Sequence, residues 1–118
     1  MRFIEILPKK LRFALEFREE SWFNEETYRV LIARNINLVV SDSSRFPSAT
    51  VMTSDFVYVR FHGPKSLYSS SYTRKELLEW SKKIKGFLRS FDVYCFFNND
   101  NNAFAVENAF LLKDLIFA

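Results

Sequence analysis

Apolar and polar residues alternate along the chain with two different periods, and these periods predict its strands and helices. In residues 11–17 the side chains of Leu11, Phe13, Leu15 and Phe17 fall on one face. The residues between them are polar or small, and this period of two is typical of a strand. Runs of β-branched and aromatic residues predict three more strands, near 36–41, 56–62 and 92–98.

Helices are predicted where apolar residues recur every three or four positions, and two of these segments carry capping signals. The predicted helices lie near 24–35, 74–89 and 103–116. Asn24 is a suitable N-cap for the first. Thr73 and Glu76 form the T-x-x-E pattern of a capping box at the start of the second.

The order of these elements predicts an α/β fold. Strands that alternate with helices pair in parallel through right-handed crossovers. The polar segment 43–55, rich in serine, threonine and proline, is predicted to be a loop that is long enough to serve as one such crossover. We therefore expect one domain, residues 1–118, built of parallel β/α units.

Composition narrows the functional classes. The chain has 118 residues and a net charge of +3, and its basic residues are scattered, which disfavours a nucleic-acid reader. No apolar run approaches the roughly 20 residues that span a membrane. Cys95 is the only cysteine and lies in an aromatic run, so a structural thiol and a reducing, cytoplasmic location are expected.

Polar side chains end each predicted strand. They are Glu16 and Arg18 at the end of the first, Ser41 and Asp42 at the end of the second, Arg60 and His62 at the end of the third, and Asn98 and Asn99 at the end of the fourth. Parallel strands bring their carboxyl ends to one edge of the sheet, where α/β proteins bind ligands. Gly63 then allows the chain to turn away from this edge.

These residue types predict a site for an anionic or hydroxyl-rich small molecule. Arg18 and Arg60 offer guanidinium forks to a carboxylate or phosphate. His62 is the candidate acid or base, because the usual pKa of histidine lies near neutrality. Asp42 and Glu16 are its candidate catalytic partners.

Further ligand contacts are expected from amides and aromatic rings near the same edge. Asn98 and Asn99 can bond hydroxyl groups or phosphate oxygens. Trp22, Tyr68 and Tyr72 follow strand ends and are predicted to form an aromatic wall against a sugar or base.

Structural roles are the alternative for each of these residues. His62 can be a hydrogen-bonded structural histidine, Arg18 and Asp42 an ion pair, and the asparagines a loop and helix cap. Glu16, Asp42 and His62 would ligate a divalent ion if they converged, although their spacing does not require a metal. No phosphate-binding loop, dinucleotide fingerprint or nucleophile elbow occurs, and the sequence identifies no cofactor.

Three stretches together resemble a known family. They are LEFR (15–18) followed by SWF (21–23), YVRFHG (58–63) followed by Tyr68 and Tyr72, and YCFFNND (94–100) followed by Ala105, Asn108 and Ala109. Asp42 also matches. This combination is similar to the YecE-like family, a domain of unknown function (number seventy-two). Glu19 departs from the family pattern, which commonly has histidine at this position.

The resemblance implies a TIM-type β/α barrel of which this chain matches only the C-terminal half. It supplies no reaction, because the activity of the family is not established. Four strands without the other half would leave two open edges and an uncovered face bearing Tyr58, Tyr94 and Phe96. We therefore expect self-association, a separate N-terminal half as partner, or instability.

Three functions remain open at this stage. The first is an enzyme or binder of a phosphorylated or sugar-like molecule. The second is a nucleic-acid-associated protein that holds a backbone phosphate at the same edge. The third is a truncated gene product without independent activity.

Overall fold

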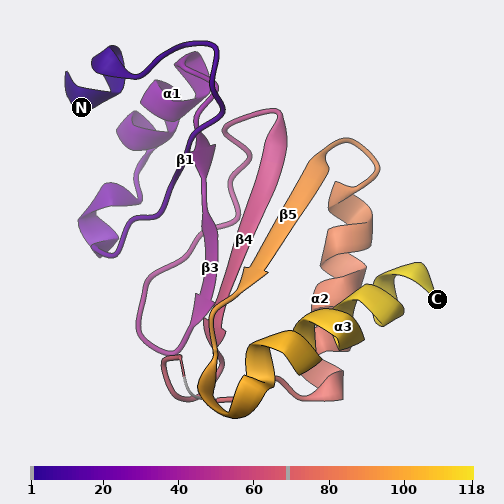
Figure 1. Cartoon of the computed structure of the whole chain (residues 1–118). Helices are drawn as coiled ribbons and strands as arrows, with labels where there is room; N and C mark the ends of the chain where they lie inside the picture. The colour runs from indigo at the N-terminus through magenta and orange to yellow at the C-terminus, as the bar shows by residue number, and fades with distance from the viewer. Residues whose placement is uncertain (1, 69) are drawn as a thin grey trace.

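The computed structural model describes residues 2–68 and 70–118 and contains both strands and helices (Figure 1). The strands are β1 (Ala14–Leu15), β2 (Asn37–Leu38), β3 (Val40–Ser43), β4 (Phe56–Gly63) and β5 (Asp92–Phe97). The α-helices are α1 (Glu25–Ala33), α2 (Arg74–Phe87) and α3 (Phe104–Phe117). Three short 3-10 helices, η1 (Arg2–Ile6), η2 (Glu20–Trp22) and η3 (Asn101–Ala103), complete the order.

The strands form two parallel sheets. β1 pairs with β2, and β3, β4 and β5 form a three-stranded sheet in that order. The prediction of parallel pairing is therefore confirmed, and the fold is mixed α/β. The segment between β3 and β4 contains no helix or strand and makes the predicted crossover.

The first two predicted strands are shorter or divided in the structure. Only Ala14 and Leu15 of residues 11–17 form a ladder, because the partner strand β2 is itself two residues long. The predicted strand at 36–41 is interrupted at Val39, where the amide N–H still bonds the carbonyl of Leu15. From the next residue the chain pairs with β4 instead of β1, so the change of partner explains the break.

One face of the three-stranded sheet forms the main core. Alternate residues of β4, namely Val57, Val59 and Phe61, are fully buried there. They pack with Leu77, Ile84 and Leu112 of the helices. Figure 1 shows α2 and α3 lying side by side on this face. A second core cluster joins α1 to β2 and η1, and contains Ile4, Leu31, Ile36 and Leu38.

The opposite side of the sheet remains partly accessible, and we call it the open face. It carries Tyr58 of β4 and Tyr94 of β5, which pair with each other. It also carries Phe96, which lies two residues after Tyr94 on β5 and therefore on the same face. Tyr94 and Phe96 are 41% and 51% exposed, whereas the residues that alternate with them, Val93, Cys95 and Phe97, pack against the helix-side core. The period of two in β5 thus separates a covered face from an uncovered one.

Both predicted helix caps are present. The Asn24 side chain accepts a hydrogen bond from the amide of Thr27 at 2.9 Å. Thr73 and Glu76 form the reciprocal bonds of a capping box at 3.1 and 2.9 Å. Within residues 2–68 and 70–118, no helix combines the length and apolarity needed to cross a membrane.

Helix α2 offers a matched test of the core, because Leu77 is fully buried and its neighbour Leu78 is 41% exposed. We expect Leu77→Ala to lower the free energy of unfolding by about 2–5 kcal/mol, since it removes buried methyl groups and leaves a cavity. Leu78→Ala should change it by only about 0.5 kcal/mol. Urea unfolding followed by circular dichroism measures both, and equal losses in the two variants would contradict this packing.

Candidate functional site

The carboxylate of Glu16 is the centre of a polar cluster at the carboxyl ends of the strands. Its Oε2 accepts a hydrogen bond from the Ser41 hydroxyl at 2.6 Å and lies 2.7 Å from His62 Nε2. Its Oε1 accepts from Arg60 Nη1 at 3.0 Å and lies 3.5 Å from Arg18 Nη2. We call these five residues, together with Asn98, the Glu16 cluster.

Strand register explains why these side chains meet. Ser41 of β3 stands opposite Arg60 of β4. His62 is two residues further along β4 and therefore shares the face of Arg60. Glu16 follows β1 immediately, so the turn of the chain after Leu15 brings its carboxylate to the same end of the strands. The prediction that Glu16, Arg18, Arg60 and His62 gather at one edge agrees with this arrangement.

His62 is enclosed, with 0% exposure. Its Nε2 meets Glu16, and Asn98 lies against the other ring nitrogen. With the amide oriented so that its oxygen accepts from Arg60 Nη2 at 3.1 Å, Asn98 places Nδ2 2.9 Å and Oδ1 3.1 Å from His62 Nδ1. A molecule bound at the edge therefore meets Glu16 or the arginines before it meets the imidazole ring.

Aromatic rings line the remaining side of the cluster. Phe46 and Tyr68 each contact the His62 ring edge-on, with centroids 5.5 Å apart. The guanidinium of Arg18 stacks over Phe46 at 4.4 Å, and its Nη2 lies 3.5 Å from the Tyr68 hydroxyl. Tyr68 has φ of 64°, a backbone conformation that is uncommon for a bulky residue and clusters at binding sites.

Opposing effects act on the pKa of Glu16. Burial of the carboxyl raises it, but the hydrogen bonds from Ser41 and His62, and the charges of His62 and Arg60, lower it. The net result is a pKa below the ordinary glutamate value. Glu16 is therefore a carboxylate at neutral pH and serves as the counter-charge of the two arginines.

Asp42 is not brought into this cluster, which corrects the expectation that it assists His62 there. It stands opposite Phe61 in the register, so its side chain leaves the strand on the helix side. Burial is the main cause that raises its pKa, the hydroxyl of Tyr72 lowers it, and the charge of Glu76 raises it further. Its surroundings thus belong to α2 and the adjoining loop.

Tyr72 and Trp22 are also placed elsewhere, so the predicted aromatic wall is reduced to Tyr68. Tyr72 is buried against Phe61 on the helix side, and its hydroxyl accepts from the amide of Gly63 and donates to the carbonyl of Asp42, both at 3.2 Å. Burial is the main reason that its pKa is raised. Trp22 stacks on Phe17 with centroids 5.2 Å apart, on the side of the second core cluster.

The two adjacent asparagines have different positions. Asn98 belongs to the Glu16 cluster, whereas Asn99 is fully buried. The Asn99 amide donates to the carbonyl of Ser70 and to Asn108 Oδ1 at 2.9 and 2.8 Å. Asn108 Oδ1 in turn accepts from the amide of Tyr72 at 3.1 Å. Asn99 and Asn108 therefore join the loop before α2 to α3 and do not face the cluster.

Gly63 is required by the backbone at the end of β4. Its φ is +114°, and an added Cβ would lie 2.5 Å from the carbonyl oxygen of Ser66. No other residue fits this conformation without strain. The turn carries the following loop back over the cluster, where Tyr68 contacts the His62 ring.

The sequence prediction placed Ser41 among the polar strand ends without giving it a role in the site, and it did not include Phe46. A signal for Ser41 was present, because a polar residue directly before Asp42 must face the other side of the strand. Phe46 had no comparable signal, since it lies in the segment 43–55, whose path depends on tertiary contacts.

No metal centre is formed by the side chains that the structure describes. No group of three or more histidine, cysteine, aspartate or glutamate residues lies close enough together to hold an ion in this part of the chain. The separation of Asp42 from Glu16 and His62 onto opposite faces accounts for this.

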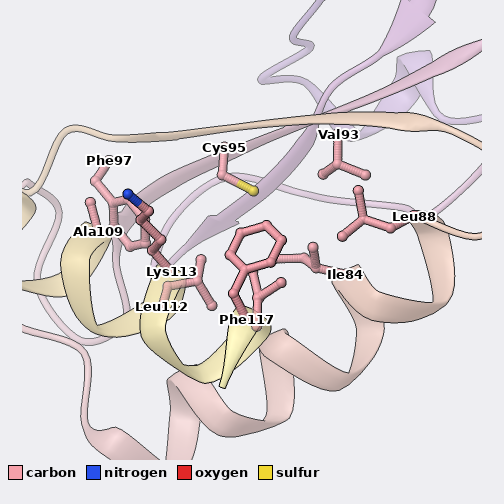
Figure 2. Close-up of a pocket in the computed structure, with 10 residues that line it drawn as sticks. Ile84, Leu88, Val93, Cys95, Phe97, Ala109, Leu112, Lys113 and Phe117 are labelled. Carbon is pink, nitrogen blue, oxygen red and sulfur yellow. The ribbon is translucent and has the colours of Figure 1, made fainter.

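A hollow of about 230 Å³ lies on the helix side between β5, α2 and α3 (Figure 2). Its lining is apolar apart from Lys113 and the thiol of Cys95. Burial raises the pKa of Cys95 to about 12, so the sulfur is a neutral thiol at physiological pH and a poor nucleophile. This hollow therefore lacks the polar groups that fix a ligand, and the Glu16 cluster is the stronger candidate site.

Glu16→Gln tests the central role of the carboxylate. Its pKa is lower in the folded than in the unfolded chain, so the ionised group stabilises the fold above the unfolded pKa and the effect is lost as pH falls through the folded pKa. We expect the variant to unfold more easily by about 1–3 kcal/mol at about pH 7, and to approach the wild type at about pH 3. Urea unfolding at both pH values measures this, with the exposed Glu19→Gln as control. A pH-independent loss would contradict the assignment.

Comparison with solved structures finds close structural relatives. A DUF72 family protein from Thermotoga maritima is 30% identical, with a TM-score of 0.88 over 99% of this chain and 50% of that chain. A DUF72 family protein from Enterococcus faecalis is 21% identical, with a TM-score of 0.81 over 93% of this chain and 50% of that chain. This chain thus spans about half the length of these relatives.

Family comparison agrees with the structural one. None of the curated proteins matches the chain, but the family model described as "Protein of unknown function DUF72" matches residues 1–117. This covers nearly every residue, including all of the Glu16 cluster. The chain therefore belongs to the DUF72 family.

Proposed function

We propose that the Glu16 cluster binds a small anionic molecule, such as a phosphorylated or sugar-like metabolite. The observation that carries the proposal is the pair of guanidinium groups held by one carboxylate oxygen, at 3.0 Å for Arg60 and 3.5 Å for Arg18. Arginine side chains fixed in this way are suited to bidentate contacts with phosphate or carboxylate.

Charge and accessibility support this proposal. Two guanidinium groups face one carboxylate, so the cluster keeps at least one net positive charge that a ligand can neutralise. The side chains of Arg60 and Arg18 are 31% and 51% exposed, whereas that of Glu16 is only 10% exposed. The cationic groups are thus the ones presented to solvent, while their counter-charge lies behind them.

The aromatic residues favour a ligand with a flat or ring-shaped part. Tyr68 is 38% exposed beside Arg18, so its ring is available for stacking against a sugar or base. Its hydroxyl, close to Arg18 Nη2, is a further hydrogen-bonding group for a phosphate or hydroxyl. This arrangement supports a sugar phosphate or nucleotide over a simple inorganic anion.

Proton transfer is a second step that the same cluster would support. The enclosed His62 does not reach a bound molecule directly. Glu16 is therefore the group placed to exchange a proton with the bound molecule, and His62, whose Nε2 lies 2.7 Å from Glu16 Oε2, positions Glu16. We therefore retain Glu16 and His62 as the candidate acid–base pair and leave Asp42 out of the chemistry. Binding is the primary proposal, and catalysis would depend on it.

We also propose that the parallel strands are half of a closed β/α barrel. Four successive extended segments, with β2 and β3 counted as one interrupted strand, are half of the eight that close a TIM-type barrel. The likeness to half of the Thermotoga maritima chain supports this. In such a barrel the Glu16 cluster would lie at the carboxyl-end mouth, where barrel enzymes bind their ligands.

The cytoplasm is the location that we propose for this activity. Phosphorylated metabolites are abundant there, and a reducing compartment suits a chain whose single cysteine, Cys95, is a partly buried free thiol. The proposal needs no disulfide and no membrane contact.

Arginine variants test the binding proposal. We expect a panel of sugar phosphates and nucleotides to raise the melting temperature of the wild type, because a ligand that binds only the folded state stabilises it. Arg60→Ala and Arg18→Ala should each weaken the binding by about tenfold or more through loss of a charge-assisted contact. Arg60→Lys should restore it only in part, since lysine lacks the planar fork.

Arg89→Ala is the matched control, because Arg89 is exposed just after α2 and precedes β5, at the opposite end of that strand from Asn98. It should bind as the wild type does. Equal weakening in Arg89→Ala would show non-specific charge attraction. Binding of single-stranded nucleic acid that falls steeply with salt, without binding of any small molecule, would favour a nucleic-acid-associated role instead.

A further inference from the structure

We propose that a hollow formed by η2 and the first two turns of α1 binds a small hydroxylated organic cation, of the amino-alcohol class. Its volume is about 270 Å³, and it is lined by Ser21, Trp22, Asn24, Glu26, Thr27 and Val30. None of these residues belongs to the Glu16 cluster. The inference therefore goes beyond the proposed anion binding and does not depend on it.

The ring of Trp22 is the aromatic wall of this hollow. One face of the ring stacks on Phe17, with centroids 5.2 Å apart and planes inclined by 15°. Trp22 is nonetheless 41% exposed, so the other face of the indole is available to a ligand. Tryptophan is the best aromatic partner for a cation placed over its ring. The stacking on Phe17 also fixes the ring in advance, which lowers the cost of ordering it on binding.

Charge around the hollow favours a cation over an anion. Residues 19–26 contain four glutamates, which are Glu19, Glu20, Glu25 and Glu26, and no lysine or arginine. This segment is strongly acidic although the whole chain has a net charge of +3. The start of α1 is not an anion site either, because the glutamates in its first turn already offset the positive end of its dipole.

Glu26 is the lining residue that can pair with a cationic group. Within residues 2–68 and 70–118 its carboxylate makes no ion pair. Arg18 and Arg29, the nearest basic residues in the sequence, do not line the hollow. Arg18 is held by the Glu16 cluster instead. An unpaired carboxylate and an aromatic face therefore border the same space, and both attract an ammonium group.

The hydroxyl of Thr27 is the group suited to recognise a hydroxyl on the ligand. Thr27 is only 5% exposed and lines the hollow. Its amide donates to Asn24 Oδ1 at 2.9 Å, whereas its hydroxyl has no hydrogen-bond partner among the described residues. An enclosed polar group that lacks a partner costs free energy. A ligand that combines an ammonium group with a hydroxyl would bond this group and also meet Glu26 and Trp22.

The size of the hollow limits the ligand to a small molecule. Its volume of about 270 Å³ is just below the range of about 300–1,000 Å³ that is usual for drug-sized ligands. A single amino alcohol suits this space, whereas a peptide or an oligosaccharide does not. Choline is therefore the probe that we choose, because it joins a quaternary ammonium group to a hydroxyl.

An NMR titration of the nitrogen-labelled 118-residue chain tests the site, because the chain has only two tryptophans. Choline should shift the indole N–H signal of Trp22 until it saturates. Trp80 is the internal control, since it packs edge-on against Phe61 and Lys83 Nζ already lies 4.6 Å from its ring centroid. Its signal should not move. Dimethylbutanol, the uncharged isostere in which carbon replaces the nitrogen, should bind about tenfold more weakly or worse.

Matched variants separate the contacts of the ligand. Glu26→Gln should weaken choline binding by about fivefold or more, through loss of the opposite charge. Glu25→Gln is its control: Glu25 is the preceding exposed residue of α1 and does not line the hollow, so the affinity should change less than about twofold. Thr27→Val, which keeps the shape of the side chain, should weaken choline by about threefold. It should not affect ethyltrimethylammonium, which lacks the hydroxyl.

Three outcomes would overturn the proposal. They are a Trp22 signal that does not respond saturably to choline, equal affinities for choline and dimethylbutanol, and equal weakening by Glu25→Gln and Glu26→Gln. The last would show a diffuse attraction of cations to the acidic segment. Circular dichroism verifies that the variants are folded. Because choline carries no phosphate, its failure to bind would leave the Arg60 experiment unaffected.

Discussion

Parallel pairing of β3, β4 and β5 is the constraint on which the other features of the molecule depend. It places Ser41 beside Arg60 and Arg60 beside Phe96 in one row across the sheet. The next row carries Phe61 and Phe97 to the opposite face, where α2 and α3 cover them. A shift of one residue in β4 would exchange its two faces and place Arg60 in the apolar core. The polar site and the core are therefore two results of the same register.

Within that frame, Glu16 allows a polar group to be buried at the strand ends. A fully enclosed imidazole needs partners for both nitrogens, and two nearby guanidinium groups repel one another unless an anion lies between them. The Glu16 carboxylate supplies a partner for His62 and a counter-charge for Arg18 and Arg60 at distances of 2.7–3.5 Å. This explains why a carboxylate with little exposure has a lowered pKa in spite of its burial.

Local pattern was sufficient to predict much of this arrangement, and tertiary packing decides the rest. The alternation of residues 11–17 correctly separated Glu16 from Phe17, and the capping signals at Asn24 and Thr73 marked the starts of α1 and α2. Asp42, Tyr72 and Asn99 were assigned to the edge because they follow strands in sequence. Each turns to the helix side, because strand parity and loop path, not proximity to a strand end, determine the direction of a side chain. The enclosure of His62 depends on Phe46, whose position no local pattern encodes.

The amide of Asn98 can pair with His62 Nδ1 through either of its polar atoms. Both amide atoms lie near the same ring nitrogen, one at 2.9 Å and the other at 3.1 Å. An unprotonated Nδ1 can accept a hydrogen bond from the amide NH₂ group, and a protonated Nδ1 can donate one to the amide oxygen. Either hydrogen bond can therefore form without a change in the Asn98 rotamer. Because the same amide oxygen also accepts from Arg60 Nη2, one asparagine couples the orientation of an enclosed ring to that of a solvent-facing guanidinium.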